Sequence, residues 1–271
     1  MCHKEESGLE QLPVATELSR DVHESGDYKV LQELVQKSAD MLNSHDPDSD
    51  LIRFREKAKS HAMCALLLRD KRDPDERLIA VGCSHLFFHA EADFWRQLQT
   101  LTAKISLHQL ACSTDNPKTG VSVFFCADMN SDPPSPAVNS MLQRNGGLVL
   151  HSAYPVTEAQ LKAESNINVD KDFTNWVGSF CCMIDYIMFG HVGWNEPSQN
   201  GSKIELKALA KLHDKNTITK ECLATDSLGE TDHTLVQIPE DMDSKNIYAL
   251  PNAHFPSDHV SLIADFQFLK K

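Results

Sequence analysis

Residues 121–130 read Val-Ser-Val-Phe-Phe-Cys-Ala-Asp-Met-Asn, and the organisation of the chain is easiest to follow outward from this segment. Its first five residues, Val121 to Phe125, are a nearly continuous apolar run, which is typical of a central strand buried on both faces. Asp128 and Asn130 then stand two positions apart, and side chains with this spacing project to the same side of a strand. The segment predicts a buried strand with an acid and an amide at its end.

Alternating apolar and polar runs predict further strands and helices on both sides of this segment. Strands are expected at 62–68, 78–88, 180–189, 204–212 and 259–269, and helices at 90–105, after the Pro-rich turn 132–136, and at 158–164. The charged turn 70–76 joins the first two strands and indicates a β-hairpin with a long loop. Strands mixed with helices in this order predict an α/β or α+β fold.

The chain divides by composition into a lead-in and a main domain. Residues 1–59 are polar, with one amphipathic helix carrying Tyr28, Leu31, Leu34 and Val35 at three- and four-residue spacing. Residues 60–271 hold the predicted strands. Within them, the polar and acidic stretch 213–247 predicts a long surface insertion.

Charge and cysteine usage exclude several classes of protein. The net charge is 26 − 39 = −13, which argues against sequence-independent coating of nucleic acid but leaves room for a small groove where a divalent cation supplies positive charge. No run of about 18 apolar residues exists, so no membrane span is expected. No secretory or mitochondrial presequence is visible at the start of the chain, and eight scattered cysteines without a CxxC pair indicate structural thiols in a reducing, intracellular compartment.

Three more polar clusters lie beside apolar or strand-like runs. His85 closes a predicted strand, Asp185 lies inside a very apolar one, and Pro256-Ser257-Asp258-His259 leads into the last. A buried carboxylate is costly unless it is paired, so we expect Asp185 to pair with His259 and fix the orientation of its imidazole. The alternatives stay open: a half-buried histidine for His85, an edge carboxylate facing water for Asp185, and a simple Asx turn for the Asp128 cluster.

Asn175 and Phe180 offer an amide and an aromatic ring within one short segment. Amides read base or sugar edges, and aromatic rings stack on bases, so the pair is a candidate substrate-binding site. The alternative is a turn with core aromatics.

Five segments together resemble the endonuclease/exonuclease/phosphatase superfamily. They are 83–89 (Cys-Ser-His-Leu-Phe-Phe-His), 125–131 (Phe-Cys-Ala-Asp-Met-Asn-Ser), 173–180 (Phe-Thr-Asn-Trp-Val-Gly-Ser-Phe), 184–187 (Ile-Asp-Tyr-Ile) and Ala249-Leu250-Pro251 through 256–259. Within the superfamily they are most similar to the deadenylase, nocturnin and Angel branch, and nearest to its 2′,5′-phosphodiesterases. The resemblance covers about residues 60–271.

This resemblance implies a four-layer sandwich: two mixed β-sheets packed face to face and flanked by helices. It also implies hydrolysis of phosphodiester bonds at an RNA 3′ end or in oligoadenylate, dependent on Mg²⁺ or Mn²⁺, with release of AMP. The mitochondrial matrix becomes a candidate location.

The resemblance also carries roles to individual residues. Asp128 would orient or deprotonate the attacking water and hold metal, together with Asn130 and Asp258. His85 and His259 would bind the scissile phosphate, with Asp185 supporting His259. Asn175 and Phe180 would hold the terminal base.

Several departures from the family pattern stand out. Ala127 replaces a usual glycine, Met129 a usual aromatic residue, Cys83-Ser84 a usual Asn-Thr, and Ala90 a usual proline. The family's metal-binding glutamate normally follows a glutamine after a buried strand, whereas Gln32-Glu33 lies in the amphipathic helix. We therefore expect a chain that lacks this glutamate and part of the N-terminal half of the fold. A catalytically impaired relative is the main alternative function, and DNA nicking or lipid-headgroup hydrolysis is a third.

Overall fold

The structure is a computed structural model of the 271-residue chain. It describes residues 9–11, 20–42, 61–73, 76–113, 120–144, 147–162, 172–192, 204–212, 214–215, 218, 250–251 and 257–268.

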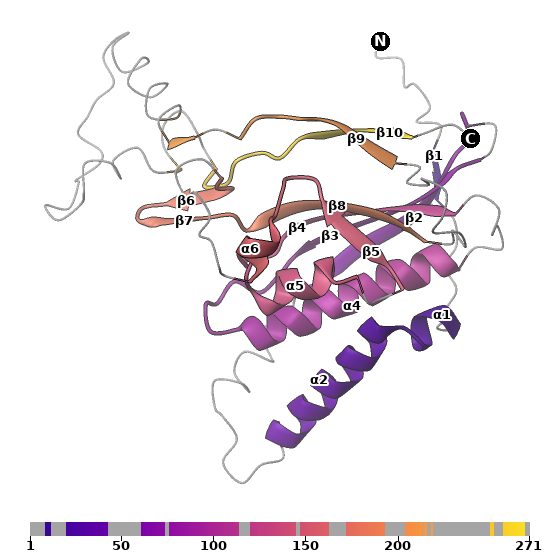
Figure 1. The fold of residues 1–271 in the computed structure, drawn as a ribbon, viewed down its shortest axis with the longest axis horizontal. Coiled ribbons are helices and arrows are strands. Elements are labelled where there is room, and N and C mark those ends of the chain that lie inside the picture. Colours follow the sequence, from indigo (N-terminus) through magenta and orange to yellow (C-terminus); the bar gives the residue numbers. More distant parts are fainter. Residues whose placement is uncertain are drawn as a thin grey trace, which may run out of the picture.

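A six-stranded mixed sheet forms the centre of the molecule (Figure 1). Its strands, in spatial order, are β1 (Leu9–Gln11), β2 (Met63–Asp70), β3 (Leu78–His85), β4 (Val121–Asp128), β8 (Asp185–Val192) and β5 (Val149–Ser152). β3 and β4 are parallel, and each other neighbouring pair is antiparallel. The buried strand predicted from residues 121–125 is confirmed as β4, and the predicted hairpin is β2 and β3.

Helix α4 (Asp93–Cys112) makes the crossover that parallel strands require and packs on one face of this sheet. Its Leu107 comes so close to the backbone of β3 that a Cβ on Gly82 would lie 2.9 Å from Leu107 Cδ2. Two shorter helices, α5 (Pro136–Leu142) and α6 (Glu158–Leu161), lie on the same side of the sheet (Figure 1). Ser135 caps α5, since its Oγ accepts a hydrogen bond from the backbone N–H of Val138.

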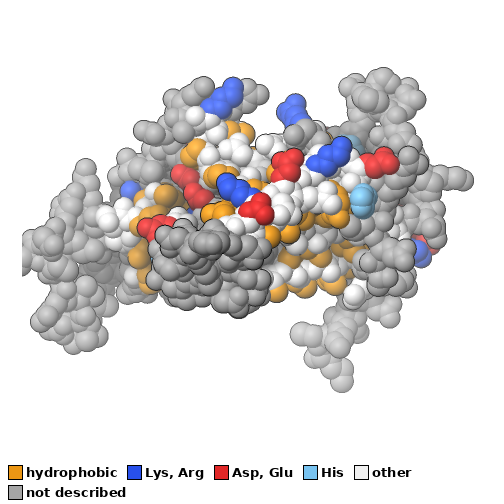
Figure 2. Space-filling view, turned by 90° about the horizontal axis from the view of Figure 1, so that it is seen from below, with side chains coloured by type: hydrophobic (Ala, Val, Ile, Leu, Met, Phe, Trp, Pro, Cys, Tyr) orange, Lys and Arg blue, Asp and Glu red, His pale blue; other side chains and the backbone are white. Residues whose placement is uncertain are grey.

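A second helical layer covers the first. It consists of α1 (Arg20–His23) and α2 (Gly26–Leu42), so the predicted amphipathic helix is confirmed. The fully buried Lys104 of α4 holds this layer: its Nζ lies 3.1 Å from an Asp27 carboxylate oxygen and donates to the carbonyls of Ser140 and Gln143. From below, where these helices lie, acidic and basic side chains are interspersed with hydrophobic ones (Figure 2).

A second sheet lies over the opposite face of the large sheet (Figure 1). Its antiparallel strands are β9 (Ile204–Leu209) and β10 (Ala264–Phe268). The Phe266 ring of β10 lies 5.0 Å, centroid to centroid, from both Phe124 and Phe189 of the large sheet. A separate hairpin, β6 (Asn175–Val177) and β7 (Phe180–Cys182), completes the strands.

The predicted α/β class, with two sheets face to face and flanking helices, is thus confirmed. In the described part of the chain, helices cover only the outer face of the larger sheet. No described helix is both long and apolar enough to cross a bilayer.

Several predicted boundaries are wrong. The strand expected at 78–88 ends at His85, because its register partner Asp128 is the last residue of the neighbouring strand β4. The strand expected at 180–189 is two strands, since Thr174 Oγ1 accepts hydrogen bonds from the N–H groups of Ile184 and Asp185 and separates β7 from β8.

Other strands were misplaced or not expected. The last strand begins at Ala264 rather than 259, and neither β5 nor β1 was among the expected strands. The predicted insertion 213–247 lies outside the described residues except at 214–215 and 218.

Candidate functional site

Three neighbouring strands bring polar side chains to one end of the large sheet. His85 ends β3, Asp128 ends β4 and Asp185 begins β8. The register pairs His85 with Asp128 and Asp128 with Asp185, so the three form one row across the sheet. His85 Nε2 lies 3.4 Å from Asp128 Oδ2. The pairing of the three strands therefore brings side chains from distant parts of the sequence into one contiguous site.

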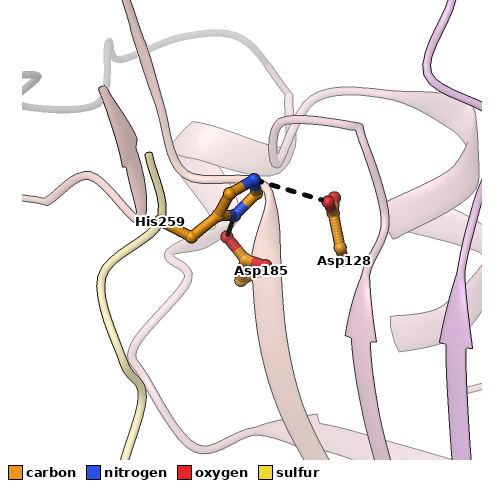
Figure 3. Close-up of side chains that lie close together, drawn as sticks. All are labelled: Asp128, Asp185 and His259. Atoms are coloured by element: carbon orange, nitrogen blue, oxygen red, sulfur yellow. Dashed lines mark hydrogen bonds and ion pairs between the residues drawn. The ribbon is translucent and has the colours of Figure 1, made fainter. Parts of the chain in front are cut away.

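His259 reaches this row from the segment before β10. Its Nδ1 lies 2.8 Å from Asp185 Oδ2, and its Nε2 lies 3.7 Å from Asp128 Oδ2, so the imidazole lies between the two carboxylates (Figure 3). A backbone bridge to Asn175 holds the residue in place, with the Val260 N–H donating to the carbonyl of Thr174. The sequence predicted the Asp185–His259 contact, and the structure places these two side chains in hydrogen-bond contact.

The surroundings of Asp185 and His259 shift the pKa of each side chain. Burial raises the pKa of Asp185 and outweighs its hydrogen bonds to Thr174 and His259, which act in the opposite direction. Burial alone would lower the pKa of His259, but the hydrogen bond and charge of Asp185, with the charges of Asp128 and Asp258, raise it above its usual value. Three carboxylates surround the ring of His259. The site therefore favours an imidazolium.

Asn130 and Asp258 lie at the edges of this group. Asn130 has φ of 46°, a left-handed conformation that asparagine tolerates, and its N–H donates to Asp128 Oδ1. Its side-chain amide donates to the carbonyl of Leu86, which ties the ends of β3 and β4 together. Asp258 Oδ2 lies 4.0 Å from His259 Nε2. All six residues expected at the centre of the site therefore lie at the same end of the sheet, while their individual roles stay predictions.

Asn175 and Phe180 occupy the β6–β7 hairpin beside His259. Asn175 is 4% exposed, and its side-chain Oδ1 has no hydrogen-bond partner among the described residues. Phe180 is 51% exposed and pairs with Val177 across the hairpin, next to the turn at Gly178. An unpaired buried amide oxygen beside an exposed ring is an arrangement that suits a ligand with a hydrogen-bond donor and a flat face.

Two of the residues that depart from the family pattern fit the positions they occupy. Ala127 is not among the described residues with positive φ, so the position does not require glycine. Met129 is fully buried in the main core.

Sequence reasoning missed Thr174, whose hydroxyl fixes the start of β8 and so positions Asp185. A polar residue directly before Asn175 was the available signal.

Asp128, Asp185 and His259 form a cluster that could hold a metal ion. One ligand atom from each lies within 4.8 Å of the others. Two carboxylates with an imidazole suit a divalent cation, and the oxygen-rich surroundings favour a hard one.

The chain is similar in sequence to known nucleases and phosphodiesterases. It is 21% identical over 220 residues to "2′,5′-phosphodiesterase 12" of Homo sapiens, a match that covers 78% of this chain and 29% of that protein. It is 27% identical over 161 residues to "CCR4-Not complex 3′-5′-exoribonuclease subunit Ccr4" of Emericella nidulans, covering 54% of this chain and 18% of that protein. The chain therefore spans less than a third of the length of these relatives. No family model matches it.

Two solved structures match part of the chain. The human nocturnin catalytic domain has a TM-score of 0.46 at 18% identity, covering 77% of this chain and 53% of that one. The 2′,3′-cyclic phosphatase ANGEL2 has a TM-score of 0.48 at 15% identity, covering 77% and 61%. The resemblance predicted from the five motifs, to the deadenylase branch of the endonuclease/exonuclease/phosphatase superfamily, is confirmed by the sequence relatives.

Proposed function

We propose that this chain carries the phosphodiester-hydrolysing site of a Mg²⁺-dependent RNA phosphodiesterase. The observation that carries the proposal is the His259 imidazole held between Asp185 and Asp128, with His85 on the other side of Asp128. Two histidines that donate protons and carboxylates that bind a cation or a water are the groups that phosphoryl transfer to water requires.

The donor set fits a hard divalent cation. Asp185 Oδ2 is already engaged by His259 Nδ1 at 2.8 Å, so Asp185 serves best as support for the ring. Asp128 would then be the main ligand, with Asp258 and the amide oxygen of Asn130 as further oxygen donors, all suited to Mg²⁺ or Mn²⁺. When bound, the cation would neutralise charge on the scissile phosphate.

The residues of the chain would divide the remaining work. Asp128 would orient the attacking water and accept its proton, while His85 and His259 would donate to phosphate oxygens. The raised pKa of His259 supports this role, because a protonated ring donates from Nε2 toward the phosphate while Asp185 holds Nδ1. Asp185 would act as a positioning residue that fixes the ring.

The substrate we propose is an adenylate chain, either 2′,5′-oligoadenylate or the 3′ end of poly(A)-like RNA, with AMP as product. The names of the sequence relatives support both linkages. Asn175 would hydrogen-bond the terminal base and Phe180 would stack on it, a contact worth about 1–3 kcal/mol. Loss of adenine preference in Phe180→Ala would support this placement, whereas an unchanged preference would favour DNA nicking or lipid-headgroup hydrolysis.

The direct test is release of AMP from 2′,5′- and 3′,5′-linked tetra-adenylates, with and without Mg²⁺. We expect metal-dependent release that falls by more than about a hundredfold in His259→Ala. Asp265→Asn, an exposed change on β10, is the matched control. A folded sample that releases no AMP under any of these conditions would reject the activity for this chain.

A second candidate is a relative that keeps the scaffold but not the activity. Gln32 and Glu33 are exposed on α2, in the helical layer on the far side of α4, so this pair supplies no ligand to the site. Calorimetric titration with Mg²⁺ separates the two candidates: binding that Asp128→Ala abolishes favours the enzyme, and absence of binding favours the inactive relative.

The proposal also includes a domain division and a location. Residues 60–271 would be the C-terminal part of a superfamily domain, with 1–59 as its lead-in and 213–247 as an insertion. An intracellular location, the mitochondrial matrix included, can be tested by fractionation of tagged full-length protein.

A further inference from the structure

A row of three cysteines crosses the large sheet beside the candidate site. Cys64 of β2 pairs in register with Cys83 of β3, and Cys83 pairs in register with Cys126 of β4. Residues paired in register point to the same face, so the three thiols share one face of the sheet. All three are free and exposed.

This face is the one that carries the candidate site. Cys83 stands two positions before His85, and Cys126 stands two positions before Asp128. Side chains two apart along a strand point the same way, at a spacing of about 6.5 Å. The cysteine row therefore lies one row behind His85 and Asp128. The next row in the same direction holds Phe124, which packs under Phe266 of β10.

Cys83 and Cys126 are neighbours close enough to react with each other. Adjacent strands lie about 4.8 Å apart, which is within the Cα separation that a disulfide spans.

We propose that Cys83 and Cys126 form an oxidisable dithiol, and that their disulfide disables the adjacent site. The second half of this statement rests on the proposed function, because the site it disables is the proposed cation and phosphate site. The oxidant is a peroxide. The Cys83 thiol loses its proton, and the thiolate attacks one peroxide oxygen. The O–O bond breaks to give a sulfenic acid, and the hydroxide that leaves takes up the proton to form water. The Cys126 thiol loses its proton in the same way, and its thiolate attacks the sulfenic acid sulfur. The S–S bond forms as the S–O bond breaks, and the second hydroxide takes up the second proton, so two thiols and one H₂O₂ yield one disulfide and two waters.

The expected effect follows from how tightly the site is built. His85 and Asp128 lie 3.4 Å apart, and one ligand-type atom from each of Asp128, Asp185 and His259 lies within 4.8 Å of the others. A disulfide holds its two Cβ atoms about 3.8 Å apart, so it would draw β3 and β4 together beside the strand ends that carry these side chains. An exposed disulfide is also readily reduced, so the change would be reversible.

The chain is well suited to mapping this bond. Trypsin cleavage after Lys59, Arg69, Arg77, Arg96, Lys118 and Arg144 puts each thiol of the row in its own peptide: Cys64 in 60–69, Cys83 in 78–96 and Cys126 in 119–144. Full-length reduced protein would be treated with H₂O₂, blocked with iodoacetamide, digested and analysed by mass spectrometry. We expect peptide 78–96 linked to 119–144, and no link in Cys83→Ser or Cys126→Ser. Cys112→Ser, which removes a half-buried thiol of α4, is the matched control and should behave as wild type. Free peptides only, or 60–69 linked to 78–96, would overturn the pairing.

Mn²⁺ binding by calorimetry tests the consequence for the site. We expect oxidation to weaken Mn²⁺ affinity by about tenfold or more, with recovery after dithiothreitol, in wild type and Cys112→Ser but not in Cys83→Ser. A mapped disulfide with unchanged Mn²⁺ affinity would overturn the inhibitory role. Reduced wild type that binds no Mn²⁺ would overturn the proposed cation site and its inhibition together, while the peptide map would still decide whether the dithiol exists.

Discussion

At the scale of single residues, His259 owes its properties to the acids around it. The ring is partly buried, which disfavours its charged form, yet Asp185 accepts from Nδ1 and three carboxylates lie within 4.0 Å of its nitrogens. A histidine whose folded pKa is raised stabilises the protein fully below the unfolded pKa of about 6.5 and loses that contribution as pH rises through the folded value. In the metal-free protein, His259 is therefore stabilising on the acidic side.

Asp185→Asn tests this account. It removes the main opposing charge, so burial should dominate and the pKa of His259 should fall. The measurement is a pH titration of the His259 ring protons by NMR in metal-free protein, with the resonance assigned by its loss in His259→Ala. Asp265→Asn should leave the titration in place. An unchanged pKa in Asp185→Asn would show that Asp128 and Asp258, rather than Asp185, control the ring.

Tyr186 gives a second prediction at this scale. Its hydroxyl, fully buried on β8, is shared between the carbonyls of Ser131 and Met183, and burial raises its pKa well above 10. The unfolded chain ionises at about pH 10 while the folded protein keeps the proton, so stability should fall above that pH by about 1.4 kcal/mol per pH unit. Tyr186→Phe should lower the free energy of unfolding by about 1–2 kcal/mol at pH 8. Its stability should also fall less steeply above pH 10 than that of the wild type, as measured by urea unfolding at pH 8 and above pH 10. Equal slopes in the two proteins would contradict the prediction.

At the scale of elements, local patterns predicted the strands and helices that form the core. The apolar patterns placed β3 and β4 to within three residues at each end, because the burial of a strand shows in its sequence. They also indicated α4, which ends at Cys112, seven residues beyond the expected end at 105. The patterns also placed His85 and Asp128 at or near strand ends, whereas Asp185, which was expected inside a strand, stands at the start of β8. Local patterns could not predict contacts between residues that are distant in the sequence. Thr174 divides β7 from β8, and the four-residue β5 exists only through its pairing with β8.

The attachment of α2 to α4 is a further feature that periodicity could not reveal. Lys104 and Asp27 form a buried ion pair across 77 positions of sequence. Burial lowers the pKa of Lys104 despite the opposing effect of Asp27, which shows how costly its charge would be without a partner. Asp27→Ala should therefore destabilise the protein by about 3–5 kcal/mol in urea unfolding.

A double-mutant cycle separates the pair from its surroundings. Lys104→Met with Asp27→Leu replaces both charges, and the double variant should be more stable than the sum of the single losses predicts. Gln36→Ala, which removes an exposed contact to Asp40 on α2, is a suitable control. Simple additivity would mean that Lys104 is held by the carbonyls of Ser140 and Gln143 rather than by Asp27.

At the scale of the whole molecule, the net charge of −13 places a demand on any RNA-binding role. The summed field repels a polyanion, so affinity must come from a few local groups and a bound cation rather than from a basic surface. The proposed site would supply these local groups and the bound cation, with Asp128 as its central carboxylate.

The expected behaviour is RNA binding that depends strongly on divalent cation and weakly on monovalent salt. Each neutralised phosphate of a single strand contributes about −0.7 to the slope of log K against log salt concentration, so contact with fewer than four phosphates gives a slope shallower than about −3. Fluorescence anisotropy with a labelled, non-hydrolysable oligoadenylate measures both dependences. Mg²⁺ should raise affinity in wild type but not in Asp128→Ala, because the cation joins protein and phosphate only where that carboxylate is present. A steep salt slope that is equal in wild type and Asp128→Ala would place the RNA on a basic surface elsewhere in the chain, and the strand-end site would lose its role in holding the substrate.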